Sequence, residues 1–519
     1  MRKLSKIVLP LVVAAIMLAA VFMLVACNGR DTTTPPNGST TDSPPIEEST
    51  DVEGFIPIRT AADLNLIRTN LNGNFRLGAN LTIENHVPIG NLATPFTGHF
   101  YVRIGENGQP QYTIETLSIN HIAAGTTQIT GLFGVNNGMV ENVVIENLNI
   151  SLQSLTIAQT FIGGIAGENT GIITNSHVEN AAITVTSDGG GIAIGAIAGI
   201  NRGENAKVEY SSSAGTINMT LGDGGAHSRA AGLVGILSEG ATVFRSSSGV
   251  NVTSVTSGSM NVTAAGLVGF VYNHGFIKES FAMGNAHTTG RGTIYAGGLT
   301  GNVQTEADAP TGSLEDFRWI IEISDSFATG NATGVSGANA YVSAFIPRLA
   351  DDEGAYSNII IRNVFSTGNS RVELHSAVTV PGNNNRVAGG IIGRYQSVRN
   401  ADDASVLTVE NAFVTGNVFG DSVELAISTT NTSVGLLFAR AQQENTHQFN
   451  NLFYLITATA IGQRAPQSFP RAETTAEGIT QIATLPNLQN STWQAANLGF
   501  DASIWTFRNG AFPMLTWAA

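Results

Sequence analysis

Most of the chain after Phe55 consists of short apolar runs that are interrupted by glycine and flanked by Ser, Thr and Asn. The segment 75–83 alternates between apolar and polar residues, which is the period of a strand with one buried face. Gly, Asn and Asp between such runs favour tight turns. The pattern predicts an all-β body with apolar residues inside and Ser, Thr and Asn outside.

One segment near the start of this body has a helical period instead. It follows a short predicted strand that begins at Phe55. Thr60 and Asp63 have the spacing of a capping box, and the three apolar residues at 64, 67 and 71 fall on one helical face. We therefore expect a single short helix that covers the first open strand edge, which would otherwise invite aggregation.

A four-residue unit, small-apolar-apolar-Gly, recurs along the rest of the chain. Its starts through residue 298 are separated by 33, 32, 36, 34 and 32 residues, and the next interval of 92 residues accommodates two longer units of about 46. A degraded copy, Ser343-Ala-Phe-Ile346, lies near the middle of that interval, and another is Gly435-Leu-Leu-Phe438. The well-preserved copies begin at Gly131, Gly164, Ala196, Gly232, Gly266, Gly298 and Gly390.

A second unit, of the form Ser-Phe-Ala-Thr-Gly-Asn, follows several copies of the first. Its phenylalanines are expected to stack as an internal ladder. They are Phe281, Phe327, Phe365 and Phe413.

Together these units resemble the GLUG motif repeats of bacterial surface proteins. Such proteins include adhesin-like lipoproteins and the non-catalytic part of some immunoglobulin A peptidases. Segments 88–100 and 112–119 look like the part that precedes such repeats, and 499–517 looks like their closing strand. The resemblance covers roughly residues 55–519 and implies a non-catalytic, adhesin-like surface protein.

Repeats of this length cannot each bury an apolar face alone, so they must stack on one another. The predicted fold is an all-β, repetitive parallel β-helix or β-solenoid with a short N-terminal capping helix. At one coil per repeat, nine repeats spaced about 4.8 Å apart span about 43 Å. The alternative is a chain of small β-sandwiches, for which a period of 32–36 residues is short.

The first 53 residues have a different composition from the repeat body. Basic residues at 2, 3 and 6 precede an apolar run that ends in Leu24-Val25-Ala26-Cys27. This ending resembles the bacterial lipobox, which implies cleavage before Cys27 and membrane attachment through two lipid signals. The alternative is an uncleaved transmembrane anchor.

Five segments follow from these patterns. They are a lipoprotein signal peptide (1–26), a lipidated cysteine with a disordered Thr/Ser/Pro-rich linker (27–53), an N-terminal entry module (54–125), repeats (126–460) and a C-terminal closing segment (461–519). This organisation predicts a lipid-anchored protein of the bacterial cell envelope, exposed outside the cytoplasmic membrane.

Charge and cysteine content narrow the possible partners. The formal net charge is −14, with charged residues at only 12%, which disfavours nucleic acid as a partner. Cys27 is the single cysteine, so the chain has no internal disulfide.

No catalytic, metal or cofactor motif stands out in the sequence. The nine histidines include no His-Glu-x-x-His pair, and no Gly-x-Ser-x-Gly elbow occurs between a strand and a helix. Acidic clusters at Asp351-Asp352-Glu353 and Asp402-Asp403 fit solvated loops, and the pairs Arg318-Trp319 and Arg394-Tyr395 place a cation beside an aromatic ring. Polar insertions near 302–320, 346–356 and 394–406 are where a site is expected, because loops on repeat scaffolds carry function.

The leading hypothesis is a non-enzymatic surface lipoprotein whose solenoid adheres to extracellular glycans or proteins. One alternative is a β-helix polysaccharide lyase or hydrolase, which would need clustered carboxylates on one face. Another is a passive structural component of the envelope.

Overall fold

The computed structural model describes residues 54–122, 125–224, 226–306, 319–351, 357–375, 385–397, 406–420, 432–441, 446–455, 460–461, 479–482 and 485–519. The chain divides into two compact units, Met1–Glu53 and Gly54–Ala519, and the described residues all belong to the second. The predicted signal peptide, Cys27 and linker lie outside the described residues.

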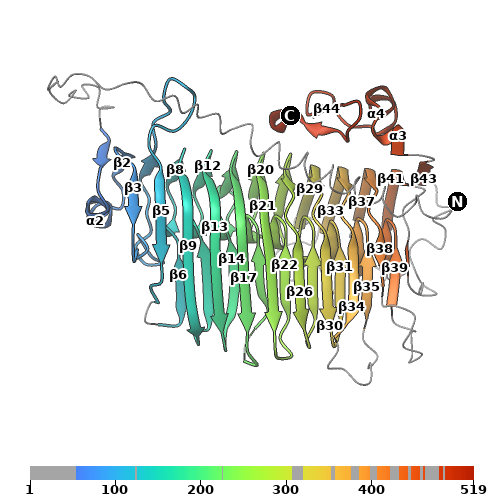
Figure 1. The fold of residues 1–519 in the computed structure, drawn as a ribbon, viewed down its shortest axis with the longest axis horizontal. Helices are drawn as coiled ribbons and strands as arrows, with labels where there is room; N and C mark the ends of the chain where they lie inside the picture. Colours follow the sequence, from blue (N-terminus) through green and yellow to red (C-terminus); the bar gives the residue numbers. More distant parts are fainter. Residues whose placement is uncertain are drawn as a thin grey trace, which may run out of the picture. The chain divides into compact units, whose positions relative to one another are not determined.

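Stacked parallel strands build the second unit (Figure 1). Sheet 1 has 25 described strands, and sheets 2 and 3 have nine each. The strand pairs of these sheets are parallel, and an antiparallel pair of strands appears in the C-terminal segment. The predicted parallel β-solenoid is therefore confirmed, and a chain of separate β-sandwiches is excluded.

Each coil contributes one strand to sheet 2, one to sheet 3 and usually two to sheet 1. The strands of sheet 2 are β6 (Thr127–Thr130), β10 (Gln159–Gly163), β14 (Gly191–Gly195), β18 (Ser228–Ala231), β22 (Val262–Ala265), β27 (Ile294–Gly297), β31 (Ala340–Ser343), β35 (Arg386–Gly389) and β39 (Thr432–Gly435). The strands of sheet 3 are β7 (Phe133–Asn136), β11 (Ala166–Asn169), β15 (Ala198–Arg202), β19 (Val234–Ser238), β23 (Val268–Tyr272), β28 (Val303–Thr305), β32 (Ile346–Asp351), β36 (Ile392–Ser397) and β40 (Phe438–Ala441). We number the coils 1–9 in this order.

Sheet 1 joins an N-terminal part to the same nine coils. Its strands before coil 1 are β1 (Ile56–Ile58), β2 (Asn74–Leu77), β3 (Leu81–Ile83), β4 (His99–Tyr101) and β5 (Ile114–Ile119). In coils 1–5 they are β8 (Met139–Glu141), β9 (Val144–Leu155), β12 (Ile172–Thr174), β13 (His177–Ser187), β16 (Lys207–Glu209), β17 (Ser212–Leu221), β20 (Ala241–Phe244), β21 (Ser247–Thr256), β24 (Gly275–Lys278), β25 (Phe281–Ala282) and β26 (Ala286–Gly290). From coil 6 onward they are β29 (Trp319–Ala328), β30 (Ala332–Ser336), β33 (Ser357–Ser366), β34 (Ser370–Leu374), β37 (Val406–Val414), β38 (Val418–Phe419), β41 (Thr446–Leu455), β42 (Ala460–Ile461) and β43 (Ile479–Ile482).

The repeated four-residue unit forms the bend between sheets 2 and 3. Its second residue points into the core in all nine coils and is fully or almost fully buried. These residues are Leu132, Ile165, Ile197, Leu233, Leu267, Leu299, Phe345, Ile391 and Leu437. The strand register places the two degraded copies one residue later than the sequence suggested, at 344–347 and 436–439.

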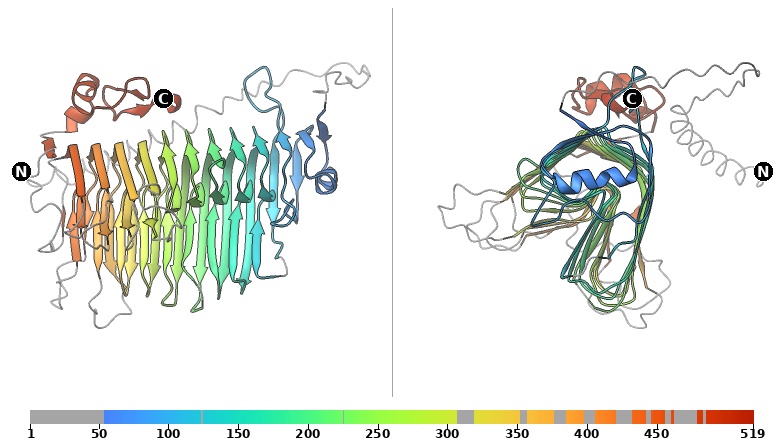
Figure 2. Two further views of the ribbon diagram at one scale, coloured as in Figure 1. Left: turned by 180° about the vertical axis from the view of Figure 1, so that it is seen from behind. Right: turned by 90° about the vertical axis from the view of Figure 1, so that its left-hand side faces the viewer.

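A short helix closes the N-terminal end of the stack, as predicted. The η1 turn (Ala61–Asp63) begins with the predicted capping box, in which the Thr60 hydroxyl accepts from the Asp63 amide and the Asp63 carboxylate accepts from the Thr60 amide. Helix α2 (Leu64–Thr69) buries Leu64 and Ile67 in the core and lies across the end of the first coils (Figure 2).

His86 is a buried polar residue close to this end. Its side chain is 3% exposed, and its Nε2 lies 2.9 Å from the carbonyl oxygen of Leu132. Burial, and to a smaller extent the nearby charge of Arg68, lower its pKa from 6.5 to about 4. His86 is therefore neutral in the fold at pH values where an unfolded chain would protonate it.

We expect this histidine to make the fold less stable in mild acid. Stability that is fully present above pH about 6.5 should be lost as the pH falls toward about 4, by on the order of 3 kcal/mol, because only the unfolded chain binds the proton in that range. Urea unfolding at pH about 7.5 and about 4.5 measures the loss. His86→Gln, which keeps a donor for Leu132, should show a smaller loss than wild type. His121→Gln, at a partly exposed site, is the control, and an equal loss in wild type and His86→Gln would contradict the assignment.

The predicted phenylalanine ladder exists, but it lies outside the main core. Phe281, Phe327, Phe365 and Phe413 stack with ring centroids 4.6–4.8 Å apart and interplanar angles of 1–6°. They belong to an apolar cluster separate from the main core, and the register continues to Phe453. The expectation of an internal ladder was wrong, because these rings point outward from sheet 1 and are buried by another part of the chain.

That covering part is the C-terminal segment 485–519, which we call the strap. It contains α3 (Leu485–Leu488), α4 (Ser491–Asn497), β44 (Trp505–Thr506), β45 (Met514–Leu515) and η3 (Thr516–Ala518). Its ring contacts run from Trp493 on Phe453 in coil 9 back to Trp517 on Phe281 in coil 5. Strands β44 and β45 pair only with each other among the described strands, so this segment is not the closing strand that the sequence suggested.

Candidate ligand-binding groove

The bend between sheets 2 and 3 folds the coils inward between two arms (Figure 2). In coils 1–6 and 8, glycine ends the four-residue unit, where the backbones of neighbouring coils approach closely. A Cβ atom on Gly235 would lie 2.5 Å from the Gly199 carbonyl oxygen, and one on Gly269 would lie 2.6 Å from that of Gly235. In these coils the last residue of the unit has no side chain, and outward side chains of sheets 2 and 3 meet across the bend, as Arg229 and Phe270 do. We call this line of facing side chains the groove.

Two adjoining cavities of about 440 and 490 Å³ occupy the groove in coils 2–6. We treat them together as the Arg229 pocket, because both include this residue. The combined lining is Ala158, Gln159, Phe161, Gly191, Ile192, Ala193, Ile200, Arg202, Ala226, His227, Arg229, Ile236, Ser238, Glu239, Phe270, Tyr272, Gln304 and Glu306. Volumes of this size, with apolar walls and a few polar groups, are typical of small-ligand sites.

Arg229, on β18, provides the central cation of this pocket. Its guanidinium carbon lies 4.3 Å from the centre of the Phe270 ring, and its Nη1 donates to the His227 carbonyl oxygen over 3.1 Å. Its Nε is buried without a hydrogen-bond partner, and no described carboxylate forms an ion pair with it. Burial lowers the pKa of Arg229 to about 10, and the nearby Tyr295 and Glu306 oppose this shift. Arg229 is thus a half-buried cation that forms no ion pair with any carboxylate in the described part of the chain.

Polar groups of coils 5 and 6 line the opposite wall. The Tyr272 hydroxyl donates to the carboxylate of Glu306. The Gln304 amide nitrogen lies 3.4 Å from the other oxygen of Glu306. The indole nitrogen of Trp319 donates to the Glu306 carbonyl oxygen over 3.0 Å. This wall therefore presents both donors and acceptors beside the cation.

A stack of rings continues the groove toward coil 7. His227 stacks on Tyr295 at 5.1 Å, and Tyr295 stacks on Tyr341 at 5.4 Å. Burial, followed by the charges of Arg229 and Arg348, holds the pKa of His227 well below its usual value. This ring is therefore neutral near neutral pH and adds no positive charge to the groove.

Two more arginines line this continuation. Arg348 and Arg394 are register partners on β32 and β36. The Arg394 Nη1 donates to the Tyr341 hydroxyl over 2.7 Å, while the nearest partner of Arg348 among the described residues is the Gln304 amide oxygen at 3.4 Å. Within the described part of the chain, neither guanidinium forms an ion pair with a carboxylate.

The structure corrects one of the predicted pairs of site residues and shows that one of the predicted insertions contributes to the pocket. Arg394 and Tyr395 do not form a shared surface, because consecutive strand residues point to opposite faces and Tyr395 is 2% exposed in the core. The aromatic ring beside Arg394 is instead Tyr341, one coil earlier. The insertion near 302–320 does contribute to the pocket through Gln304 and Glu306.

Other predicted features fall outside the described side chains. Arg318, the acidic pair at 402–403 and the side chains of the cluster at 351–353 are among them. In the part that is described, no group of three His, Cys, Asp or Glu residues is placed to hold a metal ion. No helix in that part is both long and apolar enough to cross a membrane.

Sequence reasoning missed Arg229 and Phe270, although the repeat contains a signal for them. Aligning the four-residue units places Arg229 in the same column as Phe161, Tyr295 and Tyr341, three positions before the unit begins. The column four positions after that start contains Phe270, Arg348 and Arg394. These two columns flank the bend and form the groove.

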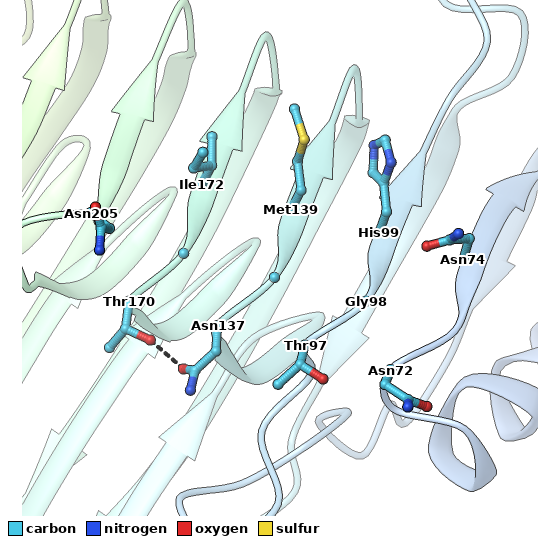
Figure 3. Close-up of a pocket in the computed structure, with 12 residues that line it drawn as sticks. Asn72, Asn74, Thr97, Gly98, His99, Asn137, Met139, Thr170, Ile172 and Asn205 are labelled. Atoms are coloured by element: carbon cyan, nitrogen blue, oxygen red, sulfur yellow. Dashed lines mark hydrogen bonds between the residues drawn. The ribbon is translucent and has the colours of Figure 1, made fainter.

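A broader depression near the N-terminal end is the other candidate (Figure 3). Its volume is about 630 Å³, and its lining is mostly Asn, Thr and Gly. The Thr170 hydroxyl is bonded to Asn137, and His99 lies 3.1 Å from the Glu141 carboxylate. Its lining includes no Arg, Lys, Asp or Glu side chain, so this depression offers a charged ligand less than the Arg229 pocket does.

Comparisons with known proteins add little to this geometry. No protein-family model matches the chain. No curated protein matches its sequence. Among solved structures, the chain is similar to the crystal structure of "a putative immunoglobulin A1 protease" from Bacteroides ovatus, at 11% identity and a TM-score of 0.33, with 89% of this chain and 92% of that chain covered. A similarity at this level transfers no activity.

Proposed function

We propose that this protein is a non-catalytic binding protein of the bacterial surface, and that its solenoid holds an extracellular ligand in the groove. The observation that carries the proposal is the Arg229 pocket, in which a half-buried cation without a described ion-pair partner lies among aromatic and apolar side chains. Pockets that bind ligands commonly combine apolar walls with a few well-placed polar groups. The ligand class that fits a surface role is an extracellular glycan or protein.

Attachment to the membrane is the second part of the proposal. The lipobox-like sequence ending in Cys27 supports lipidation, and the polar residues after it would separate the solenoid from the membrane. Incorporation of a labelled fatty acid by the wild-type chain but not by Cys27→Ser tests this anchor.

Binding of the purified full-length chain to an array of glycans, mucins and matrix proteins tests the role of the groove. Ile236 lines both cavities, so Ile236→Trp should fill the pocket and weaken binding by at least about tenfold, since losing one good contact costs about 1.4 kcal/mol or more. Ile320→Trp, at a 36% exposed site on sheet 1, adds the same bulk elsewhere and should bind like wild type.

Each result of this assay decides something. Saturable binding that a soluble competitor reverses, and that only Ile236→Trp weakens, supports the proposal. An array without any binding contradicts it and favours a passive structural role. Steady release of oligosaccharides from an arrayed polysaccharide would replace it with the carbohydrate-active enzyme alternative.

A further inference from the structure

The unmet bonding capacity of Arg229 restricts what the pocket can hold. Arg229 is half-buried, its Nε is fully covered, and no described carboxylate pairs with it. A guanidinium that has lost part of its water without a paired anion is costly, and a ligand that supplies the anion recovers that cost. Arg229 uses one donor on the His227 carbonyl oxygen and leaves its Nε unbonded. An oxyanion with two oxygens suits the planar fork of donors that arginine presents.

The opposite wall is unsuited to a simple anion. Glu306 and Glu239 line the same cavity, and their charges oppose a free anion that makes no other contacts, such as inorganic phosphate. Glu306, Tyr272 and Gln304 are instead hydrogen-bonding partners for neutral hydroxyl groups. Phe161 and Phe270 add apolar surface to the same cavity. A matching ligand carries an oxyanion, several hydroxyls and an apolar face together.

We propose that the Arg229 pocket binds an acidic saccharide, with the carboxylate or sulfate of a sugar ring on Arg229 and its hydroxyls on Glu306, Tyr272 and Gln304. This inference rests on the proposed function and names its ligand class. A cavity of about 490 Å³ has room for a ring or two of such a chain. The C–H face of the sugar lies against apolar side chains of the lining, Phe161 and Ile236 among them.

An acidic peptide fits the groove less well than a saccharide. Peptides that bind sheets usually add a strand to an open edge. The strands β18, β19, β22 and β23 around the pocket are paired on both sides by neighbouring coils. The groove therefore presents side chains and no free backbone edge.

The groove also continues beyond the pocket in a way that suits a polymer. Arg348 and Arg394 lie on adjacent coils, one strand spacing or about 4.8 Å apart along the stack. Arg348 reaches the pocket wall through Gln304. In this proposal, further acidic sugar rings of the same saccharide lie along these arginines, parallel to the stack of coils.

Calorimetric titration of the full-length chain in detergent micelles tests this inference. The probes are an oligogalacturonate, a sulfated galactan oligosaccharide, the neutral methyl ester of the oligogalacturonate and an oligoglutamate peptide. We expect saturable binding of at least one acidic saccharide, and binding of the ester and the peptide at least about tenfold weaker. The first two probes separate carboxylate from sulfate.

Variants assign the binding to the pocket. Arg229→Gln should weaken binding of the acidic saccharide about ten- to hundredfold, because a hydrogen bond between charged groups is lost. Arg362→Gln removes the same charge from an exposed arginine paired with Glu322 and should change affinity less than about twofold. If Arg229→Gln fails to fold, the comparison of acid and ester on the wild-type chain still decides the question.

The results separate this inference from the proposed function. Equal binding of acid and ester, or equal affinity of Arg229→Gln and wild type, overturns the acidic ligand. If Ile236→Trp still weakens binding of the acid, the ester or an arrayed protein in that case, the pocket remains a binding site, but for a ligand of another class. If no saccharide and no arrayed ligand binds, both proposals are contradicted.

Discussion

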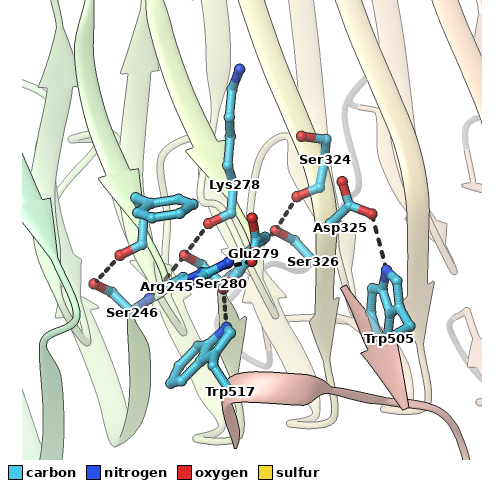
Figure 4. A network of polar contacts seen from close by, with 11 residues as sticks. Arg245, Ser246, Lys278, Glu279, Ser280, Ser324, Asp325, Ser326, Trp505 and Trp517 are labelled. Atoms are coloured by element: carbon cyan, nitrogen blue, oxygen red, sulfur yellow. Dashed lines mark hydrogen bonds and ion pairs between the residues drawn. The ribbon is translucent and has the colours of Figure 1, made fainter. Parts of the chain in front are cut away.

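Trp505→Ala should lower the free energy of unfolding of coils 5–9 by about 3–5 kcal/mol, the usual cost of removing a large buried aromatic side chain. Trp505 is 1% exposed, and its ring centroid lies 4.7 Å from that of Phe500 and 5.8 Å from that of Phe365. Its indole nitrogen donates to the Asp325 carboxylate over 2.9 Å (Figure 4). The variant therefore loses both the packing over the phenylalanine ladder and a buried hydrogen bond.

Asp325 adds to the cost of this substitution. The residue is buried at a positive φ of 50°, and burial raises the pKa of its carboxyl group while bonds from Trp505 and Asn363 oppose the rise. Without the indole, the carboxylate keeps only Asn363, whose Nδ2 lies 2.9 Å away, as a described side-chain donor. A buried acceptor that loses a partner costs about 1–3 kcal/mol.

Differential scanning calorimetry and binding of a hydrophobic dye measure this effect. In Trp505→Ala we expect a lower transition temperature and dye binding to the uncovered ladder. Trp517→Ala is the matched control, because Trp517 is 36% exposed and donates one bond to the Glu279 carbonyl oxygen (Figure 4). Equal transition temperatures for both variants and wild type would show that the strap does not stabilise the coils.

The second large effect is expected for Gly330→Ala. Gly330 belongs to the Ala-Thr-Gly-Asn unit, and a Cβ atom there would lie 1.9 Å from the carbonyl oxygen of Gly284 in the preceding coil. The obstructing atom is backbone and is fixed by strand pairing, so the coils must separate locally. We expect a loss of about 3 kcal/mol or more, at or above the upper end of ordinary overpacking.

Gly249→Ala is the control for this substitution. The nearest atom to a Cβ at Gly249 is 3.8 Å away, so the methyl group fits, and the change should be within about 1 kcal/mol of wild type. Urea unfolding of the two variants gives the comparison. The steric explanation fails if Gly330→Ala unfolds at the same urea concentration as Gly249→Ala.

The glycine and asparagine of this unit show how much of the fold the sequence predicts. Their recurrence indicated a repeat, and the structure shows why they recur. Gly284, Gly368 and Gly416 have the same close approach as Gly330. The asparagine side chains link the coils. The backbone amide of Asn331 donates to the side-chain oxygen of Asn285, and the backbone amide of Asn369 donates to the side-chain oxygen of Asn331. Such residues are visible in a sequence because they recur once per coil in coils 5–8.

The location of the phenylalanine ladder was not predictable in the same way. The period of the repeat places the rings above one another but does not say which face of sheet 1 they occupy. The strap that buries them lies far along the chain, and 180 residues separate Asp325 from Trp505. Contacts at this separation leave no local sequence pattern. A repeated apolar position therefore suggests the inside of the solenoid unless the segment that covers it from outside is known.

The pocket falls between these two cases. The columns that flank the bend can be read from the repeat, yet their members differ from coil to coil, and it is this variation that forms the site. Arg229 stands where other coils have Phe161 or Tyr295, and its contact with Phe270 joins neighbouring coils across the bend. Only the bend itself shows that the two columns face each other.

The strap has a mechanical consequence. Hydrogen bonds between strands of sheets 2 and 3 run along the stack, so tension in that direction is carried by one coil contact after another. The strap adds a second load path from coil 9 to coil 5 through Phe453, Phe365 and Phe281. Under such tension coils 1–4, which the strap does not touch through its ring contacts, should peel apart one by one. Coils 5–9 should resist as a single block.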